Sequence, residues 1–221
     1  MELTYTPGCD WFTQHIPSWE EHLHHLRGLP GLHFLEIGSF EGRSAVWLLQ
    51  NILTHPASRL TCIDLFERRE EAFNIEEHMN LNLPRNLPVE KHFDCNIRAI
   101  GAEKRVRKLK GISQEILRTL PPDAFDLVYI DGSHEAKNVL TDAVLAFDLL
   151  KNNGIMILDD YRWECFPEDP ARNPPIAIDA FLSAFRGWYD LLHKDYQMMI
   201  RKRPGRVSPT DHCAPPPGNP A

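Results

Sequence analysis

The sequence predicts an α/β protein in which helices cover both faces of a mostly parallel, seven-stranded β-sheet. Apolar runs of strand length alternate with helical patterns from residue 32 to residue 202, which is typical of parallel strands joined by helical crossovers. A turn bracketed by Gly38 and Gly42 follows the first strand and leads straight into a helix. The chain of 221 residues is long enough for one domain with a sizeable core.

The first predicted element is an N-terminal helix that lies across the domain, because apolar residues recur there at helical spacing. These residues are Phe12, Ile16, Trp19, Leu23 and Leu26. The predicted strands then cover residues 32–36, 60–64, 105–109, 126–131, 155–159, 189–194 and 197–201. The predicted helices between them cover residues 44–53, 70–81, 90–100, 113–120, 135–150 and 176–185.

The helix over 135–150 has the clearest pattern, an apolar stripe at helical spacing that Asn152-Asn153-Gly154 is expected to close. The stripe consists of Val139, Leu140, Ala143, Ala146, Phe147 and Leu150. Four prolines between residues 166 and 175 predict a loop that overhangs the carboxyl edge of the sheet. The proline-rich residues 204–221 predict a disordered tail.

Composition and charge favour a globular protein without a nucleic-acid or membrane partner. The hydrophobic fraction is 43% and the net charge is −7, whereas nucleic acids and anionic membranes attract basic surfaces. No signal-peptide pattern and no long apolar run are visible. The five cysteines are scattered without a C-x-x-C pair, which argues against a disulfide framework or a structural zinc site. We therefore expect a cytoplasmic protein.

The segment from Glu36 to Ser44 predicts a pocket for a nucleoside-type ligand. Gly38 lets a ligand approach the backbone, and the free amides of the following helix point toward it. Phe40 and Arg43 occupy the second and third glycine positions of a dinucleotide fingerprint, which disfavours a nicotinamide oxidoreductase. A nucleoside without a phosphate fits better, and S-adenosylmethionine is the favoured ligand.

Acidic residues close several of the predicted strands at one edge of the sheet. Asp64 suits a ribose, although a turn or cap role is the alternative. Asp131, Asp159 and Asp160 follow neighbouring strands, whose ends lie about 5 Å apart. Three carboxylates repel one another unless a cation lies between them, and oxygen ligands favour Mg²⁺, Mn²⁺ or Ca²⁺. The alternative is that Asp159 and Asp160 begin a solvated loop.

His134, three residues after Asp131, is the expected general base, because imidazole titrates near neutral pH. A helix cap or a surface position is the alternative. The remaining notable side chains have weaker signals. The three histidines 22, 24 and 25 are expected on a solvated helix face, and Trp11, Trp163 and Phe166 either line a substrate pocket or cover apolar surface.

The segment from Glu36 to Ser44 resembles the first motif of class I S-adenosylmethionine-dependent methyltransferases. The similarity is closest to metal-dependent O-methyltransferases of the catechol type and to natural-product sugar O-methyltransferases, and it covers about residues 32–202. It implies a Rossmann-like fold with an antiparallel last strand. It also implies a cofactor site formed by Glu36, Gly38, Ser39, Phe40, Ser44, Asp64, Ser113, Gln114 and Asp131.

The same resemblance implies that Asp131, Asp159 and Asp160 are metal ligands and that His134 is the catalytic base. His134 stands where the catechol enzymes have a lysine and some macrolide-sugar enzymes have a histidine. Certain sugar methyltransferases carry a base aspartate at the position of Ser133. The expected organisation is an N-terminal helical cap over 1–30, the methyltransferase domain over 31–203 and the tail over 204–221.

We therefore expect a magnesium- or manganese-assisted transfer of a methyl group from S-adenosylmethionine to a hydroxyl of a catechol, vicinal diol or sugar. The expected partner is this small-molecule acceptor, and a homodimer is possible. Two alternatives stay open. One is a metal-independent N- or carboxyl-methyltransferase in which Asp159 and Asp160 bind substrate, and the other is a non-catalytic module that binds S-adenosylmethionine.

Overall fold

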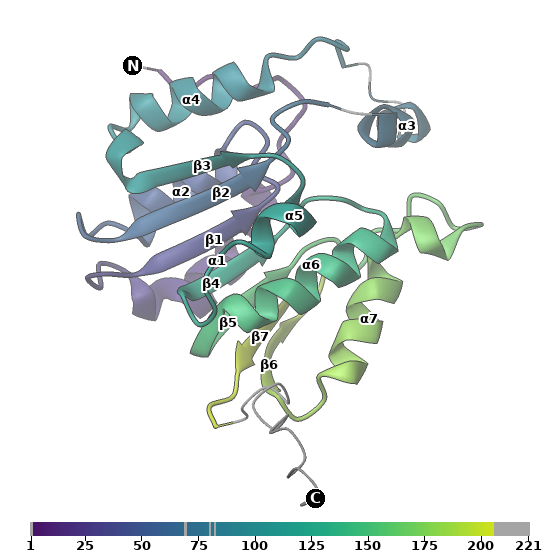
Figure 1. The fold of residues 1–221 in the computed structure, drawn as a ribbon. Helices are drawn as coiled ribbons and strands as arrows, with labels where there is room; N and C mark the ends of the chain where they lie inside the picture. Colours follow the sequence, from purple (N-terminus) through teal and green to yellow (C-terminus); the bar gives the residue numbers. More distant parts are fainter. Residues whose placement is uncertain (1, 69, 80, 82, 206–221) are drawn as a thin grey trace, which may run out of the picture.

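The computed structural model describes residues 2–68, 70–79, 81 and 83–205 and contains one seven-stranded sheet of order β3-β2-β1-β4-β5-β7-β6 (Figure 1). The strands are β1 (His33–Ile37), β2 (Arg59–Asp64), β3 (Val106–Lys110), β4 (Phe125–Ile130), β5 (Leu150–Leu158), β6 (Tyr189–Lys194) and β7 (Met198–Lys202). The α-helices are α1 (Ile16–Leu23), α2 (Arg43–Asn51), α3 (Glu70–His78), α4 (Val89–Ala99), α5 (Ser113–Leu117), α6 (Ala136–Leu149) and α7 (Pro174–Ala184).

The sheet confirms the predicted architecture. Strands β1 to β5 pair in parallel, and β7 runs antiparallel to both β5 and β6. Each predicted strand and helix is present, and most bounds shift by only a few residues. The tail predicted over 204–221 lies, from residue 206 on, outside the described residues.

The end of α6 differs from the expectation. Instead of stopping at Asn152-Asn153-Gly154, the helix ends at Leu149, and β5 begins at once with Leu150. The polar residues lie inside β5, where the pairing with β4 shifts register between Phe125 and Leu127. Asn153 has a φ of 64° at this irregularity. Burial of Leu150 against the core therefore sets the helix end, and the local glycine signal does not.

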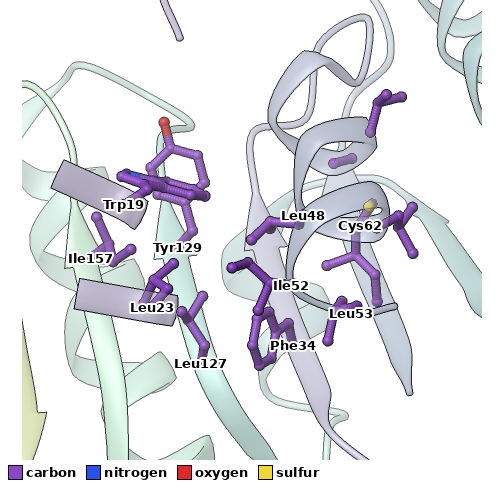
Figure 2. Packing of buried hydrophobic residues seen from close by; sticks show 14 of the residues in the cluster. Trp19, Leu23, Phe34, Leu48, Ile52, Leu53, Cys62, Leu127, Tyr129 and Ile157 are labelled. Atoms are coloured by element: carbon purple, nitrogen blue, oxygen red, sulfur yellow. The ribbon is translucent and has the colours of Figure 1, made fainter. Parts of the chain in front are cut away.

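Two apolar layers cover the sheet, because successive strand residues point to opposite faces. Helices α1, α2 and α4 pack on the face that includes Phe34, and α5, α6 and α7 pack on the face that includes Leu35. Figure 2 shows two α1 side chains, Trp19 and Leu23, beside Tyr129 of β4. The predicted N-terminal helix is thus part of the main core.

The carboxyl ends of the parallel strands are overhung by two segments. Figure 1 shows α3 and the connection from β5 to α7 on the side of the sheet where the parallel strands end. That connection contains a 3₁₀ turn (Pro170–Arg172) and includes the proline-rich loop that the sequence predicts. Among the described helices, none is long and apolar enough to cross a membrane.

Leu23→Ala tests whether α1 belongs to the core. Leu23 is fully buried between α1 and the sheet, so its truncation should lower the free energy of unfolding by about 2–5 kcal/mol. Urea denaturation measures the change. Leu29→Ala is the matched control, because Leu29 is 44% exposed in the same N-terminal region. Equal effects of the two substitutions would contradict the packing of α1.

Candidate functional site

The turn between β1 and α2 is built around a close approach of two backbones. Gly38 has a φ of 87°, and a Cβ atom at this position would lie 1.7 Å from the carbonyl oxygen of Asp131. The amide of Gly38 donates to the Ile63 carbonyl at 2.8 Å, and the amide of Asp131 donates to the Ile37 carbonyl at 2.8 Å. Glycine is therefore required here by the end of β4, before any ligand is considered.

Glu36 at the end of β1 is fully buried beneath this turn. Its two carboxylate oxygens accept the hydroxyls of Ser39 at 2.6 Å and Ser44 at 2.5 Å. Burial raises the pKa of Glu36 to about 7, although both hydroxyls counter the shift by stabilising the anion. The structure thus brings together three residues predicted for the cofactor site.

Asp64 at the end of β2 holds the same turn from the other side. One of its oxygens accepts the backbone amides of Ser39 and Phe40, each at 2.8 Å, and the other accepts the amide of Phe66. Burial raises the pKa of Asp64, and these three amides oppose that rise. A carboxylate offers about four acceptor positions, so one position remains for a ligand hydroxyl.

Ser113 and Gln114, predicted to contact adenine, begin α5 and are held by a residue that sequence reasoning missed. Asp142 in α6 accepts the Ser113 hydroxyl at 2.9 Å and the Gln114 amide at 2.8 Å. Burial raises the pKa of Asp142 to about 6. The only sequence signal for Asp142 is an acidic residue directly before the apolar stripe residue Ala143.

Glu41, also missed, ties the turn to the start of the chain. Its buried carboxylate accepts the Thr6 amide at 2.7 Å and the Thr6 hydroxyl at 2.6 Å, and it lies 2.7 Å from His92 Nδ1. Nearby, the Trp11 ring packs on the Phe40 ring at a centroid distance of 5.5 Å. Trp11 therefore lies at the turn, away from the aromatic residues of the β5–α7 loop.

The carboxylates of Asp131, Asp159 and Asp160 meet at the ends of β4 and β5. The pKa of Asp131 is raised well above its usual range by burial and by repulsion from the other two carboxylates. Burial and the Asp160 charge raise the pKa of Asp159 to about 7. The Tyr129 hydroxyl lies between two of them, donating to Asp131 at 2.8 Å and contacting Asp159. Repulsion among the three carboxylates favours either their protonation or the binding of a cation between them.

His134 faces this acidic group from the segment before α6. Its Nε2 atom lies 3.2 Å from an oxygen of Asp160, and its ring packs on Trp163 at a centroid distance of 4.7 Å. Ligand-type atoms of Asp131, His134 and Asp160 all lie within 4.8 Å of one another. The structure therefore places the predicted base at the predicted metal ligands.

Asp159 is oriented differently from its two neighbours. One oxygen accepts the backbone amide of Asp160 at 2.7 Å, and the other accepts the side-chain amide of Gln197 at 2.7 Å and contacts Tyr129. Among the residues that the structure describes, Asp159 is not part of the group with metal-ligand spacing. Gln197 and Tyr129 carried no sequence signal for a role at this site.

Two cavities are lined by residues of the β5–α7 loop, and the first of them lies beside the acidic residues. One of about 330 Å³ is lined by Met79, Arg162, Trp163, Glu164, Cys165 and Tyr196. The other, of about 570 Å³, is lined by Asn74, Glu77, Phe166 and Arg172. Tyr196 also donates its hydroxyl to Asp160 at 3.1 Å. Trp163, which packs on His134, and Phe166 thus each line a cavity. The His22 ring lies 5.2 Å from that of His193 in another part of the fold.

Comparison with known proteins finds methyltransferases. The model of a methyltransferase domain family matches residues 35–161. An O-methyltransferase of Aspergillus hancockii, hkm8, is 39% identical over 69 residues, which are 30% of this chain and 27% of that protein. This chain therefore matches less than a third of that relative's length.

Solved structures with a similar fold include two O-methyltransferases. TomG from Streptomyces achromogenes, involved in tomaymycin synthesis and solved with S-adenosylmethionine, has a TM-score of 0.60 and 19% identity, covering 85% of this chain and 80% of TomG. A putative O-methyltransferase from Klebsiella pneumoniae has a TM-score of 0.63 and 15% identity, covering 89% of this chain and 83% of the other. These similarities support the Rossmann-like fold.

Asp142→Asn tests the raised pKa of Asp142. Because the pKa rises from 3.8 to about 6 on folding, the folded protein holds this proton more tightly, and the resulting stability is lost as the pH rises through that interval. The asparagine variant should therefore be more stable than the parent by up to about 3 kcal/mol near pH 8, and equally stable near pH 4. Urea denaturation at both pH values measures this. A constant difference across the range would contradict the shift.

Proposed function

This chain belongs to the methyltransferase domain family whose model it matches, and on that premise we propose that it transfers a methyl group from S-adenosylmethionine to a hydroxyl of a small molecule. The observation that carries this proposal is the meeting of the turn at Gly38 with the acidic group around Asp131. The backbones of Gly38 and Asp131 are in direct contact. A cofactor bound at the turn and an acceptor bound at the acidic residues would therefore be neighbours.

The charges at the turn support S-adenosylmethionine as the cofactor. Glu36, Asp64 and Asp131 lie close around the turn, and each carboxyl group has a raised pKa. A positive ligand placed here would favour the ionised carboxylates, so the turn favours the sulfonium and ammonium charges of S-adenosylmethionine over a pyrophosphate. In our proposal the turn that Glu36 holds through Ser39 and Ser44 binds the methionine end, Asp64 binds the ribose, and Ser113 and Gln114 bind the adenine.

His134 is the proposed base that removes the proton of the acceptor hydroxyl. Its Nε2 atom faces Asp160 at 3.2 Å, so Asp160 orients the imidazole and stabilises it once it is protonated. Trp163 and Tyr196 bound the cavity at this point. They would hold the acceptor beside His134 and restrict water, which helps a reaction in which opposite charges disappear.

The donor set at the acidic group fits a divalent cation. Asp131 and Asp160 offer oxygens beside His134, and Mg²⁺ and Mn²⁺ prefer such ligands. We propose Asp131 and Asp160 as ligands, and Asp159, whose oxygens are taken by Tyr129, Gln197 and the Asp160 amide, supports them from behind. A bound cation would acidify the acceptor hydroxyl and favour an acceptor with two adjacent oxygens, such as a catechol or vicinal diol.

A metal-independent reaction is the second candidate, and the His134–Asp160 pair favours it. The pair already has the arrangement of a base and its orienting carboxylate. In that version Asp160 would orient His134 and no cation would be needed, so amines or carboxylates would become possible acceptors.

Transfer of a labelled methyl group from S-adenosylmethionine to a panel of catechols, glycosides, amines and carboxylic acids tests the proposal. We expect a labelled hydroxyl-bearing product, loss of turnover in excess EDTA, and recovery with Mg²⁺ or Mn²⁺. Full turnover in EDTA with a protein shown to be metal-free would select the metal-independent reaction. S-adenosylmethionine binding without turnover on any acceptor class would favour a binding module.

Asp64→Ala should weaken S-adenosylmethionine binding at least about tenfold, because each hydrogen bond to a charged group contributes ~1.5–3 kcal/mol. The substitution also frees the amides of Ser39 and Phe40. Isothermal calorimetry measures the affinity. Asp126→Ala is the matched control, since Asp126 also accepts a backbone amide, that of His33 at 2.8 Å, at the start of β1. Unchanged affinity in a folded Asp64→Ala protein would remove Asp64 from the cofactor site.

His134→Ala should lower kcat by about 10²–10⁴-fold and leave cofactor affinity nearly intact, as expected for the loss of a general base. In the wild-type protein activity should fall at low pH, where the imidazole gains a proton. The His134→Ala variant should lack this fall. Steady-state rates across pH measure both effects. His24→Ala serves as the control, because His24 lies on the exposed side of the N-terminal segment. A wild-type kcat and pH profile would make His134 a structural residue.

A further inference from the structure

A chain of hydrogen bonds reaches from the N-terminal helix to the acidic group. It begins at the indole of Trp19 in α1, passes through the side chain of Gln197, and arrives at Asp159. The indole N–H donates to Gln197 Oε1 at 2.7 Å, and Gln197 Nε2 donates to Asp159 Oδ2 at 2.7 Å. Trp19 and Gln197 are buried, so these bonds are protected from water.

The chemistry of the partners fixes the direction of this chain. An indole nitrogen only donates hydrogen bonds, so the carbonyl oxygen of the Gln197 amide must face Trp19. The amide nitrogen must then face Asp159, where it meets an acceptor. A flipped amide would set two donors against each other at one end, and its oxygen against a carboxylate oxygen at the other. Trp19 therefore sets which end of Gln197 is presented to Asp159.

Asp159 in turn constrains the two neighbouring carboxylates, those of Asp160 and Asp131. Its Oδ1 atom accepts the backbone amide of Asp160 at 2.7 Å, and Asp160 has a φ of 62°, in the left-handed region that few non-glycine residues adopt. On its other side, the Tyr129 hydroxyl contacts Asp159 and donates to Asp131 Oδ2 at 2.8 Å. One anchored carboxylate thus fixes the backbone that carries Asp160 and the side chain of Asp131.

Tyr129 is held in place by the same helix. Its ring packs edge-on against Trp19 at a centroid distance of 4.9 Å and an angle of 89°, as Figure 2 shows with the hydroxyl at the far end of the ring. Phenylalanine at 129 and leucine at 197 would fill much the same space but would leave the Trp19 N–H and the Asp159 carboxylate short of partners. A role in orienting the acidic group gives these polar atoms a function.

We propose that Trp19, Gln197 and Tyr129 are positioning residues for the cation site, which fix Asp131 and Asp160 through Asp159. This inference rests on the proposed function, in which Asp131 and Asp160 hold a divalent cation. It makes the N-terminal helix a support of the reaction centre in addition to its part in the core. Partners behind metal ligands commonly change metal affinity by about 10–100-fold when they are removed.

Mn²⁺ binding, followed by the electron paramagnetic resonance of the free ion, tests the proposal on the full chain without any turnover. Gln197→Leu and Tyr129→Phe should each weaken Mn²⁺ binding by about 10–100-fold, while calorimetry shows unchanged S-adenosylmethionine affinity. Trp19→Phe keeps an aromatic ring but removes the N–H, and it should weaken Mn²⁺ binding by less. Tyr189→Phe is the matched control, because it removes a tyrosine hydroxyl bonded to the Leu182 carbonyl at 3.1 Å, away from the acidic group.

The outcomes separate this proposal from the proposed function. Wild-type Mn²⁺ affinity in folded Gln197→Leu and Tyr129→Phe proteins would overturn the positioning role and leave the cation site standing. A parent protein that binds no Mn²⁺ would overturn both. An equal loss of Mn²⁺ and S-adenosylmethionine affinity would show general damage and also overturn the specific role. Should Gln197→Leu fail to fold, Tyr129→Phe and Trp19→Phe decide the question by the same measurements.

Discussion

Burial of carboxylates at one edge of the sheet is the constraint on which the rest of this structure depends. A carboxylate moved away from water costs several kcal/mol unless donors of the same chain replace the lost hydration. Glu36 accepts hydrogen bonds from two serine hydroxyls, and Asp64 accepts them from three backbone amides. Asp159 is bonded to a backbone amide, a glutamine and a tyrosine. The turn after β1 and the start of β7 take their conformations from these bonds.

The same constraint explains the electrostatic character of the site. Hydrogen bonds compensate for burial only in part, because Glu36 and Asp159 both keep a pKa raised to about 7. Positive ligands would recover the remaining cost, since an opposite charge stabilises the ionised carboxylate. A sulfonium cofactor on the turn and a cation at Asp131 and Asp160 would each do so. The proposed ligands of this methyltransferase-family protein therefore fit the residues proposed to bind them.

Two parts of the N-terminal segment, the residues around Thr6 and helix α1, are hydrogen-bonded to residues of the site. Thr6 reaches the turn through Glu41, and Trp19 reaches Asp159 through Gln197. The N-terminal segment thus contacts both the cofactor turn and the acidic group, although it precedes the sheet in sequence.

The strands, the helices, the glycine turn and the edge at which the acidic residues gather could all be predicted from the sequence. These features follow from local patterns, because the periodicities of strands and helices depend on residues close together in sequence. Parallel strands also end at the same edge of the sheet. Only the tertiary structure decided that α6 runs directly into β5, that Asp142 holds Ser113, and that Asp159 faces Gln197 while Asp131 and Asp160 face His134. Those choices depend on partners distant in the chain, such as Trp19 and Gln197, which are separated by 178 positions. No local pattern records such a pair, since packing of the whole sheet brings the two side chains together.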